Sequence, residues 1–205
     1  MRSELVETNN GSVIILDDVY TQDAYNIILS QVLNLIHQEK INAHDEIGTA
    51  IGDSQYLSHR KGLAIDGCFT ENRHDFLYFV EQFKTIRKVI SDIKSLPFIF
   101  RGLEKTNYDE SLLGVYGKND VYHVHNDSSV YTSVYFLYDE KKFQGGDLIF
   151  DEMNLKVDFI KNRLVIFPSW TYHSVTEVKY PENYEPNSNE FRMSIATFYL
   201  IKTDE

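Results

Sequence analysis

Two histidines and one aspartate are the residues of this sequence best suited to metal chemistry. His125 and Asp127 are separated by a single residue. Residues two apart on an extended strand face the same side, so this imidazole and this carboxylate are expected to point together. His173 lies further along the chain and offers a third ligand. Two histidines and one carboxylate leave open positions on a metal ion, as in the non-haem Fe(II) sites that activate dioxygen.

His123 offers a second way to build this site. It precedes His125 by two residues, so the pair His123 and His125 is a rival set of ligands, of the kind that cupins use. We expect four other polar residues to lie on the surface and to take no part in the site: His44, His59, Arg60 and His74.

Arg192 and Ser194 form another pair on one face of an expected strand. A planar guanidinium matches a carboxylate in bidentate geometry and stays charged at any relevant pH. Ser194 would share that face and add a hydrogen bond. Arg192 is therefore a candidate for binding a carboxylate ligand, and the alternative is an ordinary ion pair within a β-barrel.

The residues around these candidates resemble a known family. Tyr116-Gly117, Tyr122 and His125-x-Asp127 are similar to the Tyr-x-x-Gly/Tyr-x-x-His-x-Asp signature of the prolyl-4-hydroxylase-like branch of the Fe(II)/2-oxoglutarate dioxygenases. The two tyrosines align His125, and not His123, with the first metal ligand of the family. Further similar segments follow in the family's order: residues 131–137, the Gly145-Gly146-Asp147-Leu148 hairpin, residues 163–168 and Arg192-Met193-Ser194.

This resemblance, which covers about residues 112–200, implies a reaction. Fe(II) would be bound by the catalytic residues His125, Asp127 and His173. The cosubstrate 2-oxoglutarate would bind Tyr116, Arg192 and Ser194. Dioxygen would be consumed, with ascorbate as an optional reductant, and an aliphatic C–H of a prolyl or other amino-acid side chain would be hydroxylated with release of succinate and CO2.

The implied substrate is a peptide or a free amino acid. Relatives that halogenate lack the aspartate of the triad, so Asp127 favours hydroxylation.

This sequence differs from the family pattern at two places, and it has two glycines at the expected hairpin turn. The interval between His173 and Arg192 is longer than is usual in the family, and the extra length lies in residues 179–190, a polar loop that we expect to shape the mouth of the site. Phe136 stands where some relatives have a tyrosine that binds the cosubstrate. Gly145 and Gly146 are expected to serve the hairpin turn alone.

Two other functions fit the same residues. A cupin-like metal or small-molecule binding protein, or a sensor, would work without turnover, would not need Arg192 and would favour His123 as a ligand. A metal-dependent isomerase on the same fold would need no dioxygen and would release no succinate.

Composition narrows the class of protein. A chain of 205 residues is long enough for one domain with a proper core, and the formal net charge of −11 without a basic stripe disfavours nucleic acid as a partner. The single cysteine, Cys68, allows no internal disulfide. No apolar run is long enough to cross a membrane, so we expect a cytoplasmic protein with no membrane partner, and the oligomeric state stays open.

Hydrophobic spacing predicts helices first and strands afterwards. Residues 21–40 have apolar side chains at helical spacing, and residues 41–70 are expected to form a loop that contributes to covering the substrate. Residues 71–95 are expected to form a second helix, whose inner face carries Phe76, Val80, Phe83, Ile86, Ile90 and Ile93. Strands are expected near residues 13–16, 98–102, 111–117, 121–126, 130–137, 146–151, 155–160, 163–168, 173–178 and 191–201.

These elements predict a mainly β protein with helical backing, and a jelly roll satisfies the pattern. The resemblance narrows this to a double-stranded β-helix, a cupin-like barrel with two N-terminal helices. We expect a single oxygenase domain over residues 1–205. Residues 1–97 would supply mostly helical support and a loop, and residues 98–205 the barrel.

Overall fold

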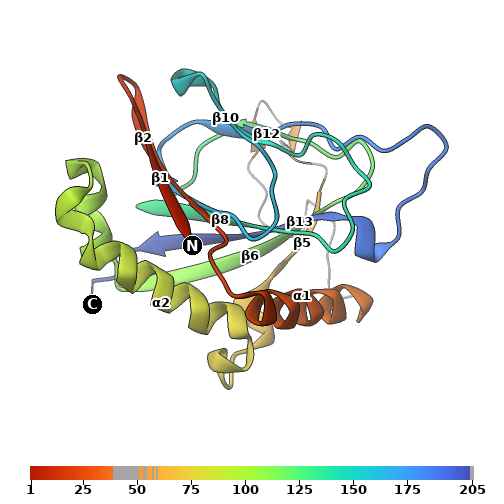
Figure 1. Ribbon diagram of the computed structural model, residues 1–205, viewed down its shortest axis with the longest axis horizontal. Helices are drawn as coiled ribbons and strands as arrows, with labels where there is room; N and C mark the ends of the chain where they lie inside the picture. The colour runs from red at the N-terminus through yellow and green to blue at the C-terminus, as the bar shows by residue number, and fades with distance from the viewer. Residues whose placement is uncertain (39–50, 53–54, 57, 59, 204–205) are drawn as a thin grey trace.

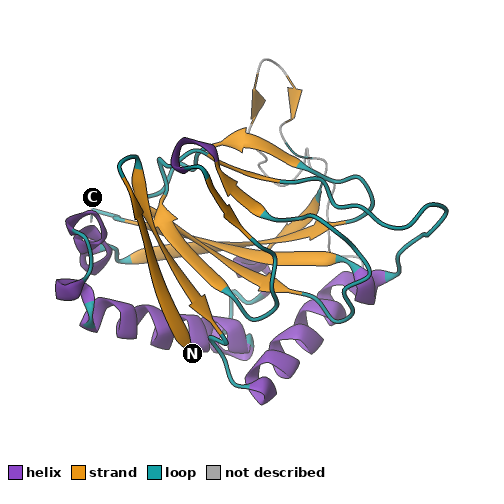
Figure 2. Ribbon diagram, turned by 45° about the horizontal axis from the view of Figure 1, so that its top comes forward, coloured by secondary structure: helices purple, strands orange, loops and turns teal. Residues whose placement is uncertain are grey.

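Two antiparallel β-sheets face each other, and two helices cover the outer side of the larger one (Figures 1 and 2). The computed structural model describes residues 1–38, 51–52, 55–56, 58 and 60–203. The layers are therefore helices, large sheet and small sheet, which is the predicted double-stranded β-helix with helical backing. No helix in these ranges is both long and apolar enough to span a membrane.

The large sheet has seven strands and the small sheet four. The order in the large sheet is β1 (Arg2–Thr8), β2 (Gly11–Asp17), β11 (Leu164–Pro168), β8 (Tyr131–Leu137), β13 (Arg192–Leu200), β6 (Tyr108–Tyr116) and β5 (Lys61–Ala64). The order in the small sheet is β10 (Leu155–Val157), β9 (Leu148–Phe150), β12 (His173–Val175) and β7 (Tyr122–His125). A separate hairpin pairs β3 (Ile51–Gly52) with β4 (Gln55–Tyr56).

Strand β8 explains why the large sheet needs cover on both faces. All seven of its residues are buried. Tyr135 and Leu137 belong to the core under the helices, whereas Val134 and Phe136 belong to the core between the sheets. Because successive side chains of a strand alternate between faces, one strand contributes to two apolar layers.

The first helix, α1 (Gln22–His37), agrees with its predicted pattern. The Thr21 hydroxyl accepts a hydrogen bond from the backbone N–H of Ala24, which caps the first turn. The predicted inner residues are buried: Tyr25, Ile28, Leu29, Val32 and Ile36.

The second helix, α2 (Leu77–Ser91), is shorter than predicted, and its inner face agrees with the prediction only in part. Ile86 is buried as expected, and so is Phe76 just before the helix. Phe83 was also expected in the core, but 67% of it is exposed. The inner face also carries Tyr78 and Gln82, and a prediction that counted only apolar residues could not place Gln82 there.

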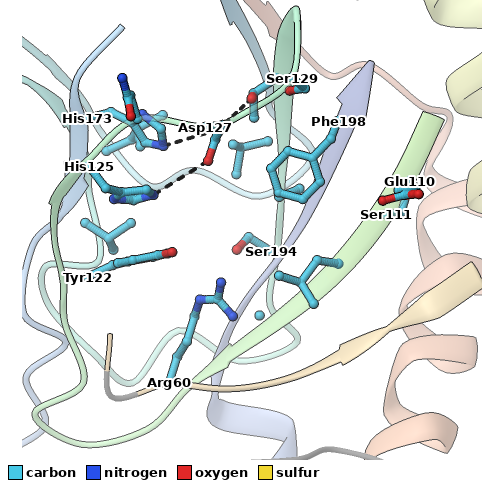
Figure 3. A pocket seen from close by; sticks show the side chains of 18 of the residues that line it. Arg60, Glu110, Ser111, Tyr122, His125, Asp127, Ser129, His173, Ser194 and Phe198 are labelled. Carbon is cyan, nitrogen blue, oxygen red and sulfur yellow. Dashed lines mark hydrogen bonds and ion pairs between the residues drawn. The ribbon is translucent and has the colours of Figure 1, made fainter. Parts of the chain in front are cut away.

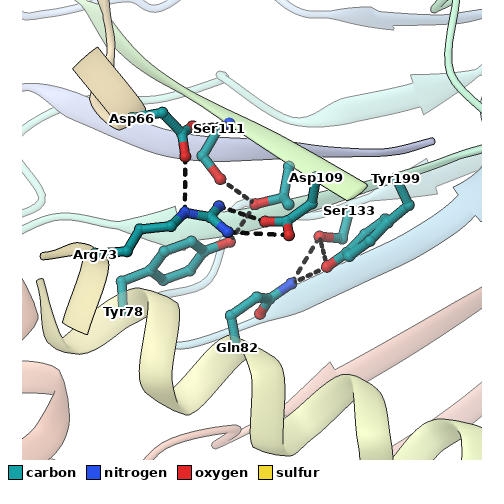
Figure 4. Close-up of polar contacts among 9 residues, drawn as sticks. Asp66, Arg73, Tyr78, Gln82, Asp109, Ser111, Ser133 and Tyr199 are labelled. Carbon is teal, nitrogen blue, oxygen red and sulfur yellow. Dashed lines mark hydrogen bonds and ion pairs between the residues drawn. The ribbon is translucent and has the colours of Figure 1, made fainter. Parts of the chain in front are cut away.

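Those polar side chains attach α2 to the back of the large sheet (Figure 4). Gln82 Nε2 donates to the Ser133 hydroxyl at 2.9 Å, and the Tyr78 and Thr197 hydroxyls are 2.8 Å apart. Just before the helix, the Arg73 guanidinium binds both carboxylate oxygens of Asp109. Because buried polar groups are costly unless satisfied, this network fixes the position of the helix on the sheet.

Other boundaries also differ from the sequence prediction. Residues 98–102 were predicted as a strand but belong to a 3₁₀ helix, η4 (Phe98–Lys105), which begins after Pro97. Besides the two helices, the first 97 residues supply three strands of the large sheet, β1, β2 and β5. The remaining short 3₁₀ helices are η1 (Ile65–Cys68), η2 (Arg73–Asp75), η3 (Ile93–Ser95), η5 (Asp151–Met153) and η6 (Ser188–Glu190).

Candidate metal centre and its cavity

The pairing of β7 with β12 brings two histidines from distant parts of the chain side by side. His173 is the direct register partner of His125 in this antiparallel pair. Asp127 follows β7 by two residues, and its backbone N–H donates to the Ser169 carbonyl at 2.9 Å. That bond fixes the turn after β7 and directs the carboxylate toward the two imidazoles.

The three side chains converge on one point in the cavity (Figure 3). His125 Nε2 lies 3.8 Å from Asp127 Oδ1, and His173 Nε2 lies 3.7 Å from Asp127 Oδ2. One donor atom from each of the three residues lies within 4.8 Å of the others. His123, the rival ligand, is exposed and does not belong to this cluster.

Hydrogen bonds fix the tautomers of both histidines. His125 Nδ1 lies 2.8 Å from the His123 carbonyl oxygen, and His173 Nδ1 lies 3.0 Å from the Thr171 carbonyl oxygen. A carbonyl oxygen only accepts, so each Nδ1 carries the proton. Each Nε2 therefore presents a free lone pair to the cavity, as metal-binding histidines do.

Neighbouring side chains also hold the Asp127 carboxylate and the His125 ring in place. The Thr132 hydroxyl donates to Asp127 Oδ2 at 2.6 Å and lies 2.9 Å from the Ser169 hydroxyl. The Tyr122 ring stacks on the His125 ring, with 3.7 Å between centroids and 14° between planes. Such supporting contacts orient metal ligands before the metal binds.

Burial sets the protonation of this cluster. It lowers the pKa of His125 to about 4, with a further contribution from the neighbouring His173. It also lowers the pKa of His173 to about 4. Burial raises the pKa of the Asp127 carboxyl, against the hydrogen bond from Thr132. At neutral pH both imidazoles are uncharged, so they can bind a cation without first losing a proton.

The two low histidine pKa values predict that the metal-free protein loses stability on mild acidification. The unfolded chain takes up protons near pH 6.5, whereas the folded chain does so near pH 4, so the unfolded state gains as the pH falls between these values. We expect the free energy of unfolding to fall by on the order of 3 kcal/mol between pH 7 and pH 5. The raised pKa of Asp127 acts in the opposite sense at the acid end of this range.

Urea unfolding in EDTA at several pH values measures this loss. His125→Gln is the matched variant, because it removes one of the two titrating groups and should flatten the profile. Equal profiles for the two proteins would contradict the assignment of the pH dependence to the histidine pair.

Arg192 lies deep between the sheets and is fully buried. Its guanidinium lies between two rings, with Cζ 4.2 Å from the Tyr116 centroid and 4.3 Å from the Phe159 centroid. Its Nη1 donates to the Ser194 hydroxyl at 2.8 Å and its Nε to the Gly146 carbonyl at 3.2 Å. Within the described part of the chain, Nη2 has no hydrogen-bond partner.

A buried guanidinium with a free N–H is a site for an anion. Leaving a buried charged donor without a partner costs free energy, which an anionic ligand would recover. Burial lowers the pKa of Arg192 to about 10, so the side chain is still charged at neutral pH. Phe136 contributes only an apolar wall, with its ring centroid 5.7 Å from Arg192 Cζ.

Gly146 does more than form the predicted turn. Its φ is +71°, and a Cβ there would lie 3.0 Å from Arg192 Cγ. The prediction that Gly145 and Gly146 serve the hairpin alone was therefore wrong for Gly146, because Arg192 packs against its backbone. Gly145 also needs to be glycine, since a Cβ would lie 2.1 Å from the Glu177 carbonyl oxygen.

The cluster and Arg192 line a single cavity of about 440 Å³, within the usual range for ligand pockets. Tyr116 and Ser194, which the sequence placed near the cosubstrate, line it as well. None of residues 179–190 lines this cavity. The loop is closed on itself, for example by the Tyr184 hydroxyl donating to the Glu190 carboxylate.

Arg60 was missed by the sequence analysis. It was expected on the surface, yet only 5% of it is exposed and it lines the cavity. From the segment 41–70, Ala64 lines the cavity too. His74 is exposed as expected, whereas His44 and His59 lie outside the described residues.

Comparison with known proteins agrees with this geometry. The sequence model of the 2OG-Fe(II) oxygenase superfamily matches residues 112–200, which contain all three residues of the cluster and Arg192. Over these residues, which include most strands of the barrel, the sequence is similar to that superfamily. No curated protein matches the sequence of this chain.

Solved structures share the fold of this chain at low identity. A Pseudomonas putida prolyl-4-hydroxylase has a TM-score of 0.62 and 16% identity, over 95% of this chain and 94% of its own. A viral collagen prolyl hydroxylase from Paramecium Bursaria Chlorella virus-1 has a TM-score of 0.56 and 12% identity, over 92% of this chain and 96% of its own. The non-heme alpha ketoglutarate dependent epimerase SnoN has a TM-score of 0.60 and 11% identity, over 94% of this chain and 78% of its own.

The donor set fits the cofactors of the superfamily that the sequence model describes. Fe(II), 2-oxoglutarate and dioxygen are those cofactors. Two neutral imidazole nitrogens and one carboxylate suit Fe(II), so His125, Asp127 and His173 would hold the ion.

Proposed function

We propose that this oxygenase is an Fe(II)- and 2-oxoglutarate-dependent hydroxylase of an aliphatic C–H bond, in a prolyl or other amino-acid side chain. The observation that carries the proposal is the convergence of His125 Nε2, His173 Nε2 and the Asp127 carboxylate at the end of the cavity that also contains Arg192. These three residues would hold the metal. The fold similarity to two prolyl hydroxylases supports the substrate class.

The chain's own residues bind and orient the reactants. Arg192 would bind the distal carboxylate of 2-oxoglutarate through its free Nη2, and Ser194 keeps that guanidinium in place. Tyr116 would hold the cosubstrate from the side through its ring and hydroxyl. When bound, Fe(II) and 2-oxoglutarate supply dioxygen activation, in which one oxygen atom enters the product and the other enters succinate as CO2 leaves.

Succinate release tests this proposal. The protein with Fe(II), 2-oxoglutarate and air would be assayed against proline-containing peptides and free amino acids, with product hydroxylation followed by mass spectrometry. We expect succinate and hydroxylated product in equal amounts, and neither without dioxygen. Product formed without dioxygen would indicate an isomerase. Metal binding without the absorbance band of the Fe(II)–2-oxoglutarate chelate would indicate a binding protein.

A further inference from the structure

Arg60 is a second buried cation in the cavity, and the proposed chemistry does not use it. Its side chain rises from the segment before β5, and Figure 3 shows the guanidinium reaching into the cavity between Tyr122 and Ser194. Its Nη1 is buried without a hydrogen-bond partner in the described part of the chain. A guanidinium held in this way is available to an anion that enters the cavity.

The neighbouring residues are arranged to hold Arg60 at this place. Its Cζ lies 4.9 Å from the centroid of the Tyr122 ring, whose other face stacks on His125. Gly114 on β6 leaves the space for its stem, because a Cβ there would lie 3.2 Å from Arg60 Cδ. The Tyr122 ring therefore separates Arg60 from His125, one of the three candidate metal ligands.

The two cavity arginines face different parts of the site. The Tyr116 ring lies 4.2 Å from Arg192 Cζ and 6.0 Å from Arg60 Cζ. Arg192 is enclosed by Tyr116 and Phe159, whereas Arg60 lies against Tyr122 on the side of His125. One carboxylate cannot fill both positions in bidentate geometry, since a bidentate pair takes one planar fork.

Among the described residues, the charges of the loaded site leave Arg60 without a compensating anion. Fe(II) and Arg192 would bring three positive charges, which Asp127 and the two carboxylates of 2-oxoglutarate would balance. Glu110, the other carboxylate among the described residues of the cavity wall, is exposed and lies across the cavity from Arg60 (Figure 3). A further anion beside Arg60 would balance its charge, and the remaining ligand of such an enzyme is its primary substrate.

The rest of the open wall is apolar. Leu112 on β6 and Ala196, Phe198 and Leu200 on β13 line the cavity and are only partly buried. Their side chains share one face of the large sheet with Arg192 and Ser194, because residues two apart on a strand face the same side. This surface fits an apolar body attached to the anion.

We propose that Arg60 determines substrate specificity by binding a carboxylate of the primary substrate, whose apolar body lies along Leu112, Ala196 and Phe198. This rests on the proposed function, and it narrows the substrate to an apolar compound with a free carboxylate. The carboxylate belongs either to a free amino acid or to the C-terminus of a peptide. A blocked, internal peptide segment without an acidic group would not satisfy Arg60.

Binding measurements without turnover test this role. The protein would be saturated with Fe(II) and 2-oxoglutarate under anaerobic conditions, and the chelate band would be recorded first. Isothermal titration would then compare cyclohexanecarboxylate with cyclohexanecarboxamide, and L-leucine with a tripeptide that ends in leucine, as free acid and as amide. The variants are Arg60→Gln, which removes the charge, and Arg60→Lys, which keeps it, with circular dichroism to check that each is folded.

We expect wild type to bind cyclohexanecarboxylate at least about tenfold more tightly than the amide, which is the effect of one charge-assisted hydrogen bond. The preference should disappear in Arg60→Gln and persist in part in Arg60→Lys, with the Kd of 2-oxoglutarate unchanged in both. Tighter binding of leucine or of the free-acid tripeptide then identifies the source of the carboxylate.

The proposal is overturned if wild type shows no preference for the acid, or if the preference survives in Arg60→Gln. It is also overturned if Arg60→Gln weakens 2-oxoglutarate by more than about threefold. Failure of the proposed function looks different, because the chelate band would be missing from wild type before any probe is added.

Discussion

Asp127→Ala is expected to abolish turnover and to weaken Fe(II) binding by more than about 100-fold. Replacing a residue that only supports a metal ligand already costs 10–100-fold in metal affinity, and Asp127 would be a ligand itself. The change also leaves two neutral imidazoles without the anion that offsets the charge of the metal. Anaerobic equilibrium dialysis with Fe(II), followed by the succinate assay, measures both effects.

His123→Ala is the matched control for this experiment. His123 is exposed and two residues from His125, so its loss should leave the metal affinity and turnover within about twofold of wild type, as for most surface changes. Its backbone carbonyl, which orients His125, is retained in the variant. If His123→Ala lost the metal and Asp127→Ala kept it, the cupin-like pair would be the site and the oxygenase proposal would fail.

Local periodicity explains only part of the agreement between the predicted cluster and the structure. The period of two predicted that His125 and Asp127 point the same way, but Asp127 lies beyond the end of β7, and its backbone hydrogen bond to Ser169 fixes its place. His173 is far away in the chain, and no local rule pairs it with His125. That pairing could be predicted only because the order of the motifs resembles a family in which the two strands are neighbours.

Neither local sequence patterns nor the family resemblance could predict that Arg60 is buried in the cavity. It lies in a segment without regular spacing, outside the residues that resemble the family. Its burial depends on the missing side chain of Gly114, which lies on another strand. The place of Gln82 on the inner face of α2 was missed for a related reason, since it is buried by partners on β8 and β13 that the helix sequence does not reveal.

The strand error at residues 98–102 has a local cause. Phe98, Ile99 and Phe100 have high strand propensity, and the preceding Pro97 was interpreted only as the end of a helix. Proline is equally suited to start a helical turn, and the segment forms η4 instead, with Phe98 left 79% exposed. Short apolar segments beside proline do not separate these two outcomes by periodicity.

Arg192→Met is expected to weaken 2-oxoglutarate binding by about 30-fold or more while Fe(II) binding is retained. Removing one partner of a buried, hydrogen-bonded charge pair costs about 2–5 kcal/mol, and the variant would leave the distal carboxylate without its cation. Methionine keeps most of the volume between Tyr116 and Phe159, so the loss reports charge and hydrogen bonding more than packing. Titration of the Fe(II)-loaded protein with 2-oxoglutarate, followed by the chelate absorbance, gives the affinity.

Two further variants make the result specific to the position of the charge. Arg192→Lys keeps the charge without the planar fork and should give an intermediate affinity. Arg163→Met removes a guanidinium that pairs with Asp17 outside the cavity, so it should leave the affinity for 2-oxoglutarate unchanged. If Arg192→Met bound 2-oxoglutarate as wild type does, the cosubstrate carboxylate would have to lie elsewhere. Arg60 is the other cavity guanidinium with a free N–H among the described residues. In that case Arg60 would be assigned to 2-oxoglutarate and Arg192 to the carboxylate of the substrate.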